Sequence, residues 1–106
     1  MSKYLLQASY TPEGVRGLLK DGGTGRKKAV TELMQSLEGK LESFYFAYGE
    51  TDVFCILDVP DPAAAAAAAL AVSASGAVRC RTTVLITPEE MDKATKKTAR
   101  YTPPGK

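Results

Sequence analysis

Few side chains in this 106-residue chain are of the types that carry chemistry. Histidine, the usual general base and the usual haem ligand, is absent. No carboxylates have the spacing of a general acid and base, and no nucleophile lies beside a base in the sequence. Two polar groups could nevertheless bind a ligand. Asp52 could accept hydrogen bonds, and the guanidinium of Arg81 could hold a carboxylate or phosphate through two parallel bonds.

A second candidate for binding is a glycine-rich, basic segment. Its residues Thr24, Gly25, Arg26 and Lys27 would open a basic helix, and the amides at a helix start can cradle an anion. The segment lacks the spacing of a Walker phosphate-binding motif and does not directly follow a strand. Two interpretations stay open: a small anion site, or a flexible kink between two helical segments, which the sequence favours.

Composition limits the class of protein to one soluble globular domain with 44% apolar and 25% charged residues. No apolar run reaches the roughly 20 residues that span a bilayer, and the first residues lack a secretory pattern, so we expect a cytoplasmic location. Cys55 and Cys80 lack the spacing of a metal or redox motif. We therefore expect no metal, no cofactor, and two buried thiols that act as small apolar residues.

The elements that position these residues are organised around the stretch Leu41–Pro60, which predicts two strands joined by a turn at Gly49-Glu50. A two-residue loop there would pair Phe46 with Val53, Phe44 with Cys55 and Glu42 with Leu57. Strand residues alternate between faces, so one face of this hairpin is apolar enough for a core. The other face would carry a mixture of apolar and polar side chains: Leu41, Ser43, Tyr45, Ala47, Asp52, Phe54, Ile56 and Asp58.

The rest of the chain supplies a strand and a helix on each side of this hairpin. The pattern predicts strands over 3–10 and 77–87, a helix from Thr11 to about Glu38 broken at Asp21-Gly22-Gly23, an alanine-rich helix after Asp61, and a short terminal helix after Thr87. The order β-α-β-β-α-β indicates an α+β, ferredoxin-like fold with strand order 4-1-3-2 and both helices on one face of an antiparallel sheet.

The face without helices would remain apolar and uncovered. It would hold Tyr45, Phe54, Ile56 and Arg81 among other side chains. Two copies packed sheet to sheet would cover it, so we expect a homodimer or higher homo-oligomer.

The chain resembles the GYD-domain family of small bacterial proteins, which belong to the dimeric α/β-barrel group of ferredoxin-like folds. The resemblance rests on the segments 38–41, 48–53, 60–62 and 76–79 and covers roughly Lys3 to Lys97. Gly49 and Asp52 stand at the glycine and aspartate of the motif that names the family, whereas Thr51 occupies the tyrosine position. We therefore expect one GYD-type domain over residues 1–97, followed by a flexible basic tail over 98–106, whose last residues should fray.

Two functions from different classes remain. The first is an oligomeric accessory protein that binds a small molecule in a pocket by the open sheet face, lined by Tyr45, Asp52, Phe54 and Arg81. Alternatively, the two aromatic rings form an oligomer interface and the arginine pairs with a nearby aspartate. The second function is a cofactor-independent monooxygenase, by analogy with relatives of this architecture. Nucleic-acid binding is not expected, because the strand after the turn is acidic at both ends.

Overall fold

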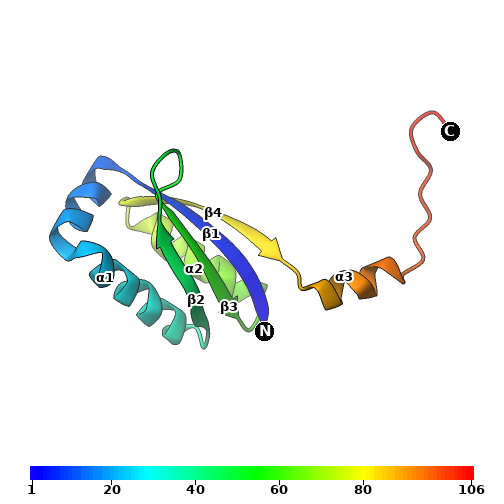
Figure 1. Cartoon of the computed structure of the whole chain (residues 1–106), viewed down its shortest axis with the longest axis horizontal. Coiled ribbons are helices and arrows are strands. Elements are labelled where there is room, and N and C mark those ends of the chain that lie inside the picture. The colour runs from blue at the N-terminus through cyan, green and yellow to red at the C-terminus, as the bar shows by residue number, and fades with distance from the viewer.

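The computed structural model describes residues 1–106 and contains four strands and three helices (Figure 1). In chain order they are β1 (Ser2–Tyr10), α1 (Pro12–Ser36), β2 (Lys40–Phe46), β3 (Val53–Val59), α2 (Pro62–Ala74), β4 (Val78–Leu85) and α3 (Pro88–Thr95). The strands form one antiparallel sheet in the order β2-β3-β1-β4. Helices α1 and α2 cover one face of this sheet (Figure 1), so the predicted ferredoxin-like α+β fold is confirmed.

Helix α1 begins as its sequence predicts and is kinked where two glycines interrupt it. The Thr11 hydroxyl accepts a hydrogen bond from the Gly14 amide at 3.2 Å and donates one to the Gly76 carbonyl at 3.0 Å. A Cβ atom at Gly14 would collide with the carbonyl oxygen of Ala77, so only glycine fits this contact. Gly22 has a φ of 75° and a ψ of 169°, which breaks the helical path at the predicted position.

The end of α1 differs slightly from the prediction. The helix ends at Ser36, two residues before the predicted end, and Glu38, with a φ of 60°, takes the left-handed conformation that glycine most often adopts after a helix. Gly39 is required for a different reason. A Cβ atom there would lie 2.8 Å from the carbonyl oxygen of Asp58, closer than real Cβ contacts allow.

The core lies between the sheet and the two covering helices. Helix α2 starts at the Asp61 cap, whose Oδ1 accepts from the Ala64 amide at 2.9 Å, and buries Ala65 and Ala68 against the sheet. These short side chains let the helix approach closely, as the alanine run predicts. The core cluster is made of Tyr4, Leu6, Met34, Cys55, Leu57, Val59, Ala65 and Ala68.

The central hairpin keeps the predicted register near its turn and loses it farther away. Phe46 pairs with Val53, and Phe44 with Cys55. The predicted pairing of Glu42 with Leu57 is wrong, because a bulge between Leu41 and Ser43 places Leu41 opposite Leu57. Leu41 therefore packs against the core and does not lie on the open face. The connection is also longer than the predicted two residues: the strands stop at Phe46 and resume at Val53, so the loop comprises residues 47–52.

The two cysteines have different surroundings. Both thiols are free, as expected. Cys55 is buried, but Cys80 is only half-buried, because it lies on the edge strand β4 beneath the alanine-rich helix. The Sγ atom of Cys80 lies 3.4 Å from the hydroxyl of Ser73 on α2.

Beyond β4 the chain leaves the domain. Helix α3 starts at the predicted capping box, in which the Thr87 hydroxyl accepts from the Glu90 amide and the Glu90 carboxylate accepts from the Thr87 amide. Figure 1 shows this helix and the following residues extending away from the sheet. None of the helices in the chain has the length and apolar content required to cross a bilayer.

Candidate functional site

The loop between β2 and β3, residues 47–52, reaches both faces of the sheet. Ala47, Tyr48 and Asp52 line a pocket on the side of helix α1, which we call the helix-side pocket. Glu50 and Thr51 line a hollow on the uncovered side, which we call the open-face hollow. The loop therefore contributes to two separate candidate binding sites.

The helix-side pocket has a volume of about 500 Å³ and mostly apolar walls. It lies between the first half of α1 and the ends of β1 and β2, where the kink in α1 turns the helix across the sheet. A Cβ atom at Gly23 would lie 3.1 Å from the ring of Phe46, so the absence of a side chain there keeps this space open. Its lining residues are Tyr10, Val15, Leu18, Gly23, Phe46, Ala47, Tyr48 and Asp52.

Asp52 is the acidic group of this pocket and also anchors the loop. Its Oδ2 accepts a hydrogen bond from the Tyr10 amide at 2.8 Å, and its own amide donates to the Ala8 carbonyl at 2.8 Å. Its carbonyl accepts from the Ala47 amide at 2.8 Å, which closes the base of the loop. Oδ1 has no hydrogen-bond partner within the chain. The carboxylate therefore fixes the loop to β1 with one oxygen and keeps the other free to accept.

Tyr10 lies at the junction of the pocket with α1. Burial raises the pKa of its phenol, while the neighbouring Arg26 guanidinium opposes that rise. Arg26 is itself held by Asp21, with Nη1 3.4 Å from Oδ2. A tyrosine phenol is protonated at neutral pH, and the raised pKa extends that state to higher pH, so the hydroxyl is available as a hydrogen-bonding group.

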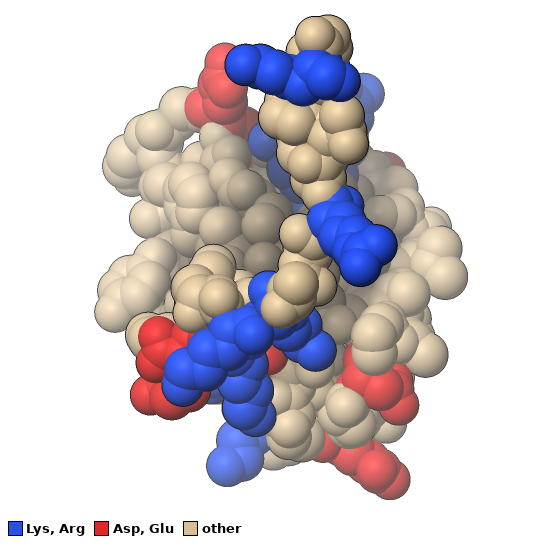
Figure 2. Space-filling model, turned by 90° about the vertical axis from the view of Figure 1, so that its right-hand side faces the viewer, with Lys and Arg blue, Asp and Glu red and all other residues tan.

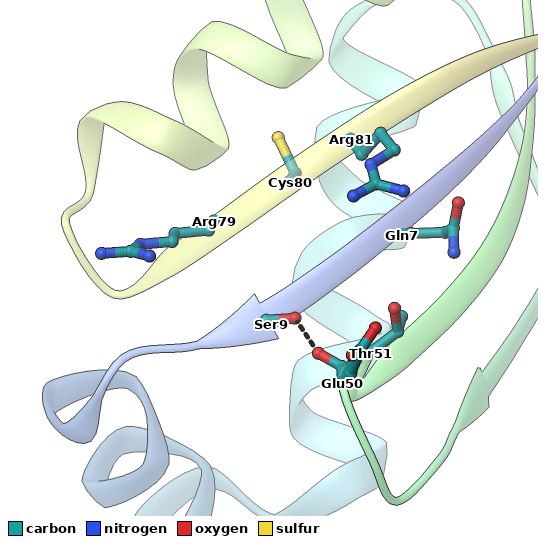
Figure 3. A pocket seen from close by; sticks show the side chains of 7 residues that line it. All are labelled: Gln7, Ser9, Glu50, Thr51, Arg79, Cys80 and Arg81. Atoms are coloured by element: carbon teal, nitrogen blue, oxygen red, sulfur yellow. Dashed lines mark hydrogen bonds between the residues drawn. The ribbon is translucent and has the colours of Figure 1, made fainter.

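The open-face hollow, about 450 Å³ in volume, is polar (Figure 3). Gln7 lies opposite Arg81 and Ser9 opposite Arg79 in the β1–β4 pairing, so the four side chains share one face. Figure 3 shows Arg81 directed toward Gln7 and Arg79 directed away along its strand, while Cys80 points to the other face. Ser9 donates to the Glu50 carbonyl at 2.7 Å, which ties the loop to this site.

The two arginines of this hollow have no acidic partner. The ion pairs in the chain join Lys3 to Glu42 and Asp58, and Arg26 to Asp21. The alternative in which Arg81 pairs with Asp52 or Asp58 is therefore not what the structure contains. The guanidinium of Arg81 remains free to bind an anion.

The four side chains expected to line one pocket lie in three places. Asp52 lies in the helix-side pocket and Arg81 in the open-face hollow. Tyr45 and Phe54 pair across β2 and β3 on the open face, 71% and 37% exposed, and line neither cavity. The alternation of strand residues predicted that Asp52 lies on the open face. This prediction is wrong because Asp52 belongs to the loop, where its carboxylate turns toward the Tyr10 amide at the end of β1.

The glycine-rich segment forms the start of the second half of α1. Thr24 and Lys27 line a shallow exposed groove on the helix surface. Gly25 lies beside Asp21, and Arg26 forms an ion pair with Asp21, so an acidic side chain already lies beside the amides that were expected to cradle an anion. Elsewhere, no group of three or more histidine, cysteine, aspartate or glutamate side chains could hold a metal ion.

Sequence reasoning missed the residues that shape the helix-side pocket. Tyr10, Gly23 and Phe46 come from three separate elements, and only the kink brings them together. The adjacent glycines were the available signal. They predicted a break in the helix but not the space that the break leaves against the sheet.

Fold and pockets together define a small α+β domain with a ferredoxin-like sheet and a candidate ligand pocket at its central turn. The family model of the GYD domain matches residues 4–95, so the chain belongs to the GYD-domain family. No match to the chain was found among curated proteins or among solved structures. Of the motif, Gly49 has a φ of 133°, which favours glycine, and Asp52 anchors the loop.

Proposed function

We propose that this chain is a small-molecule-binding accessory protein whose ligand occupies the helix-side pocket. The observation that carries the proposal is the composition of the pocket. Its volume of about 500 Å³ falls in the range of ordinary ligand sites, and apolar walls surround a few polar groups. Val15 and Phe46, which are 44% and 42% exposed, leave apolar surface on the wall of the pocket that a ligand would cover.

The polar groups of the pocket favour a particular kind of ligand. The free Oδ1 of Asp52 is an acceptor and the remaining lining is largely apolar. An unpaired carboxylate oxygen beside apolar walls favours a partner that donates a hydrogen bond. The ligand we propose has an apolar body and carries an amine or hydroxyl group.

The proposed working form is a homo-oligomer that packs through the open face of its sheet. Tyr45 and Phe54 are exposed side by side on that face, with Leu5 and Ile56 next to them. A second copy would remove these apolar side chains from water. The location we propose is the cytoplasm, since both cysteines are free, as is usual in a reducing compartment.

The pocket is tested by titrating the protein with Nile red, a neutral apolar dye, and following its fluorescence. Saturable binding of one dye per chain is expected for the wild type. The variant Ala47→Phe places a ring in the pocket and should weaken binding by about tenfold or more, because the ring removes the space that the dye needs.

A pair of glycine variants provides a matched control. Gly23→Ala adds one methyl group against Phe46 and should weaken dye binding, whereas Gly25→Ala adds the same group outside the pocket and should leave it unchanged. Both replacements favour the helical conformation by a similar amount, so a difference between them reports on the cavity. Equal dye affinity in the wild type and Ala47→Phe would contradict the proposal.

A further inference from the structure

The open-face hollow contains polar side chains whose hydrogen-bonding groups are not used within the chain. Ser9 donates to the Glu50 carbonyl, but the side chains of Gln7, Thr51 and Arg81 form no hydrogen bond to another residue. Gln7 is half-buried on β1, which lies between β3 and β4 in the sheet. Donor groups that converge on one hollow without partners in the chain are available to a ligand that accepts hydrogen bonds.

The pairing of the strands places the hollow at one end of a row of side chains that crosses the sheet. Arg81 on β4 lies opposite Gln7 on β1, and Gln7 lies opposite Phe54 on β3. Residues opposite one another in a sheet share a face, so these three side chains all stand on the open face. With strands about 4.8 Å apart, the backbones of Arg81 and Phe54 are separated by roughly 10 Å. A small ligand with one polar and one apolar end can therefore contact both.

The charges around the hollow indicate that the polar end of such a ligand carries one negative charge. The charged lining residues are Arg79, Arg81 and Glu50, so two guanidinium groups and one carboxylate leave a net charge of +1. Neither arginine is paired with an acid, and Figure 3 shows that it is Arg81 that is directed toward Gln7. A guanidinium binds a carboxylate through two parallel hydrogen bonds. A phosphate, with up to two negative charges, would exceed the net positive charge and be repelled by Glu50.

The other basic side chains of the molecule do not form a comparable site. Figure 2 shows lysine and arginine side chains along the C-terminal segment that projects from the sheet, but none of the cavities is lined by residues 86–106. Lys27 and Lys28 line the shallow groove on α1, which contains Glu32 and no apolar residue. Arg26 is held in its ion pair with Asp21. Among the cavities, the open-face hollow alone combines an unpaired guanidinium with a neighbouring aromatic ring.

We propose that the open-face hollow is a second ligand site, which binds a small monocarboxylate that carries an apolar or aromatic group. The guanidinium of Arg81 holds the carboxylate, the Gln7 amide donates a further hydrogen bond, and the apolar group lies against Phe54, whose side chain is 37% exposed. The site is separate from the helix-side pocket of the proposed function, where the Asp52 carboxylate would repel a ligand of like charge.

The position of the site determines how its ligand behaves. The ligand lies at the boundary between the polar β1–β4 part of the open face and the aromatic part proposed for assembly. A single guanidinium–carboxylate contact at an accessible surface gives a dissociation constant on the order of 1 mM. Such a ligand exchanges freely and is lost during purification, so a mass that stays bound to the purified protein belongs to the helix-side pocket.

The inference is tested by titrating the full chain with sodium phenylacetate and following its amide NMR spectrum. Saturable shifts centred on Gln7 and Arg81 are expected, with weaker binding of acetate and of inorganic phosphate. Arg81→Gln should raise the dissociation constant for phenylacetate by about tenfold or more, because it removes both charge-assisted hydrogen bonds. Arg79→Gln is the matched control: it removes the same charge from the same exposed strand, but its guanidinium is directed away, so the constant should change by about threefold at most. Equal losses in the two variants, or phosphate binding as tight as that of phenylacetate, would overturn the inference.

A cross-test separates this site from the helix-side pocket. Ala47→Phe should leave phenylacetate binding unchanged, and Arg81→Gln should leave Nile red binding unchanged, because the two residues line different cavities. Loss of phenylacetate binding in Ala47→Phe, or shifts centred on Tyr10 and Asp52, would place the carboxylate in the helix-side pocket and overturn the inference. If Nile red fails to bind while phenylacetate binds at Arg81, the proposed function fails and this second site stands.

Discussion

The two faces of the sheet differ in burial and in the kinds of side chain they carry, although the same four strands form both. On β3, Leu57 points to the helices and is 1% exposed, while its neighbour Ile56 points to the open face and is only half-buried. The helix-covered face holds the core and the helix-side pocket, whereas the open face holds Tyr45, Phe54 and two unpaired arginines. Alternation along a strand thus separates the core and the proposed ligand pocket on one face from the proposed assembly surface on the other.

The largest expected effect comes from adjacent residues on the two faces. Leu57→Ala should lower the free energy of unfolding by about 2–5 kcal/mol, because it leaves a cavity in a closed core. Ile56→Ala should cost no more than about 1 kcal/mol in the dissociated chain, since water already reaches that side chain. Urea unfolding at low protein concentration measures both. Similar losses at the two positions would contradict the division between the faces.

The second-largest expected effect is a loss of folding stability at alkaline pH, caused by a thiol on the helix-covered face. Burial raises the pKa of the Cys55 thiol from 9.0 to about 11. Between those values the unfolded chain has lost a proton that the folded chain retains, so stability is fully present below pH 9 and falls as pH rises to about 11. For a difference of two pKa units the loss amounts to about 3 kcal/mol. Burial likewise raises the pKa of Tyr10, which acts in the same direction.

The variant Cys55→Ala removes the thiol and checks this assignment. Its unfolding free energy should be lower than that of the wild type at pH 8 but should fall less steeply across the same alkaline range. Chemical denaturation at several pH values gives the slopes. If the two proteins have the same slope, the thiol does not cause the loss.

Changes on the open face should affect assembly and leave folding almost untouched. Phe54→Lys puts a charge in the apolar part of that face, where the native ring is 37% exposed. We expect the thermal stability of the dissociated chain to change by about 1 kcal/mol or less, and the oligomer to dissociate, because the charge would be buried between two sheets. Sedimentation velocity measures the second effect. An unchanged oligomer would show that the open face is not the interface.

The smallest effect concerns the turn. Thr51 occupies the tyrosine position of the family motif and lines the open-face hollow. Thr51→Tyr should change the stability of the chain by no more than about 0.5 kcal/mol, because the residue is half-exposed and lies outside the strands. Thermal unfolding measures it. A loss several times larger would show that the turn restricts this position more than its exposure suggests.

The fold was predictable because local signals agreed with one another. Thr11-Pro12, Asp61-Pro62 and Thr87-Pro88 each start a helix, and the glycine pair breaks α1 at Gly22. The alternation of the strands fixed the core register up to Phe44 and Cys55. Each of these features depends on residues close together in the sequence, so the pattern contains the information.

The site was less predictable because it depends on contacts between distant elements. The bulge that places Leu41 against the core cannot be recognised from the alternation of apolar and polar residues in β2. Asp52 changed face because its carboxylate binds an amide of β1, which is 42 residues away in the chain. The sequence also did not indicate that helix α3 would bury none of its residues, since its capping box and basic charges are those of an ordinary terminal helix.

The division between the two faces is tested most directly by native mass spectrometry of the protein purified from its own host. The wild type, Ala47→Phe and Phe54→Lys are compared under gentle conditions and again after denaturation. The wild type should be a dimer or larger and carry an extra small-molecule mass. Ala47→Phe should keep the oligomer and lose that mass, whereas Phe54→Lys should be monomeric. A monomeric wild type, or an oligomer whose bound mass survives Ala47→Phe, would contradict the account.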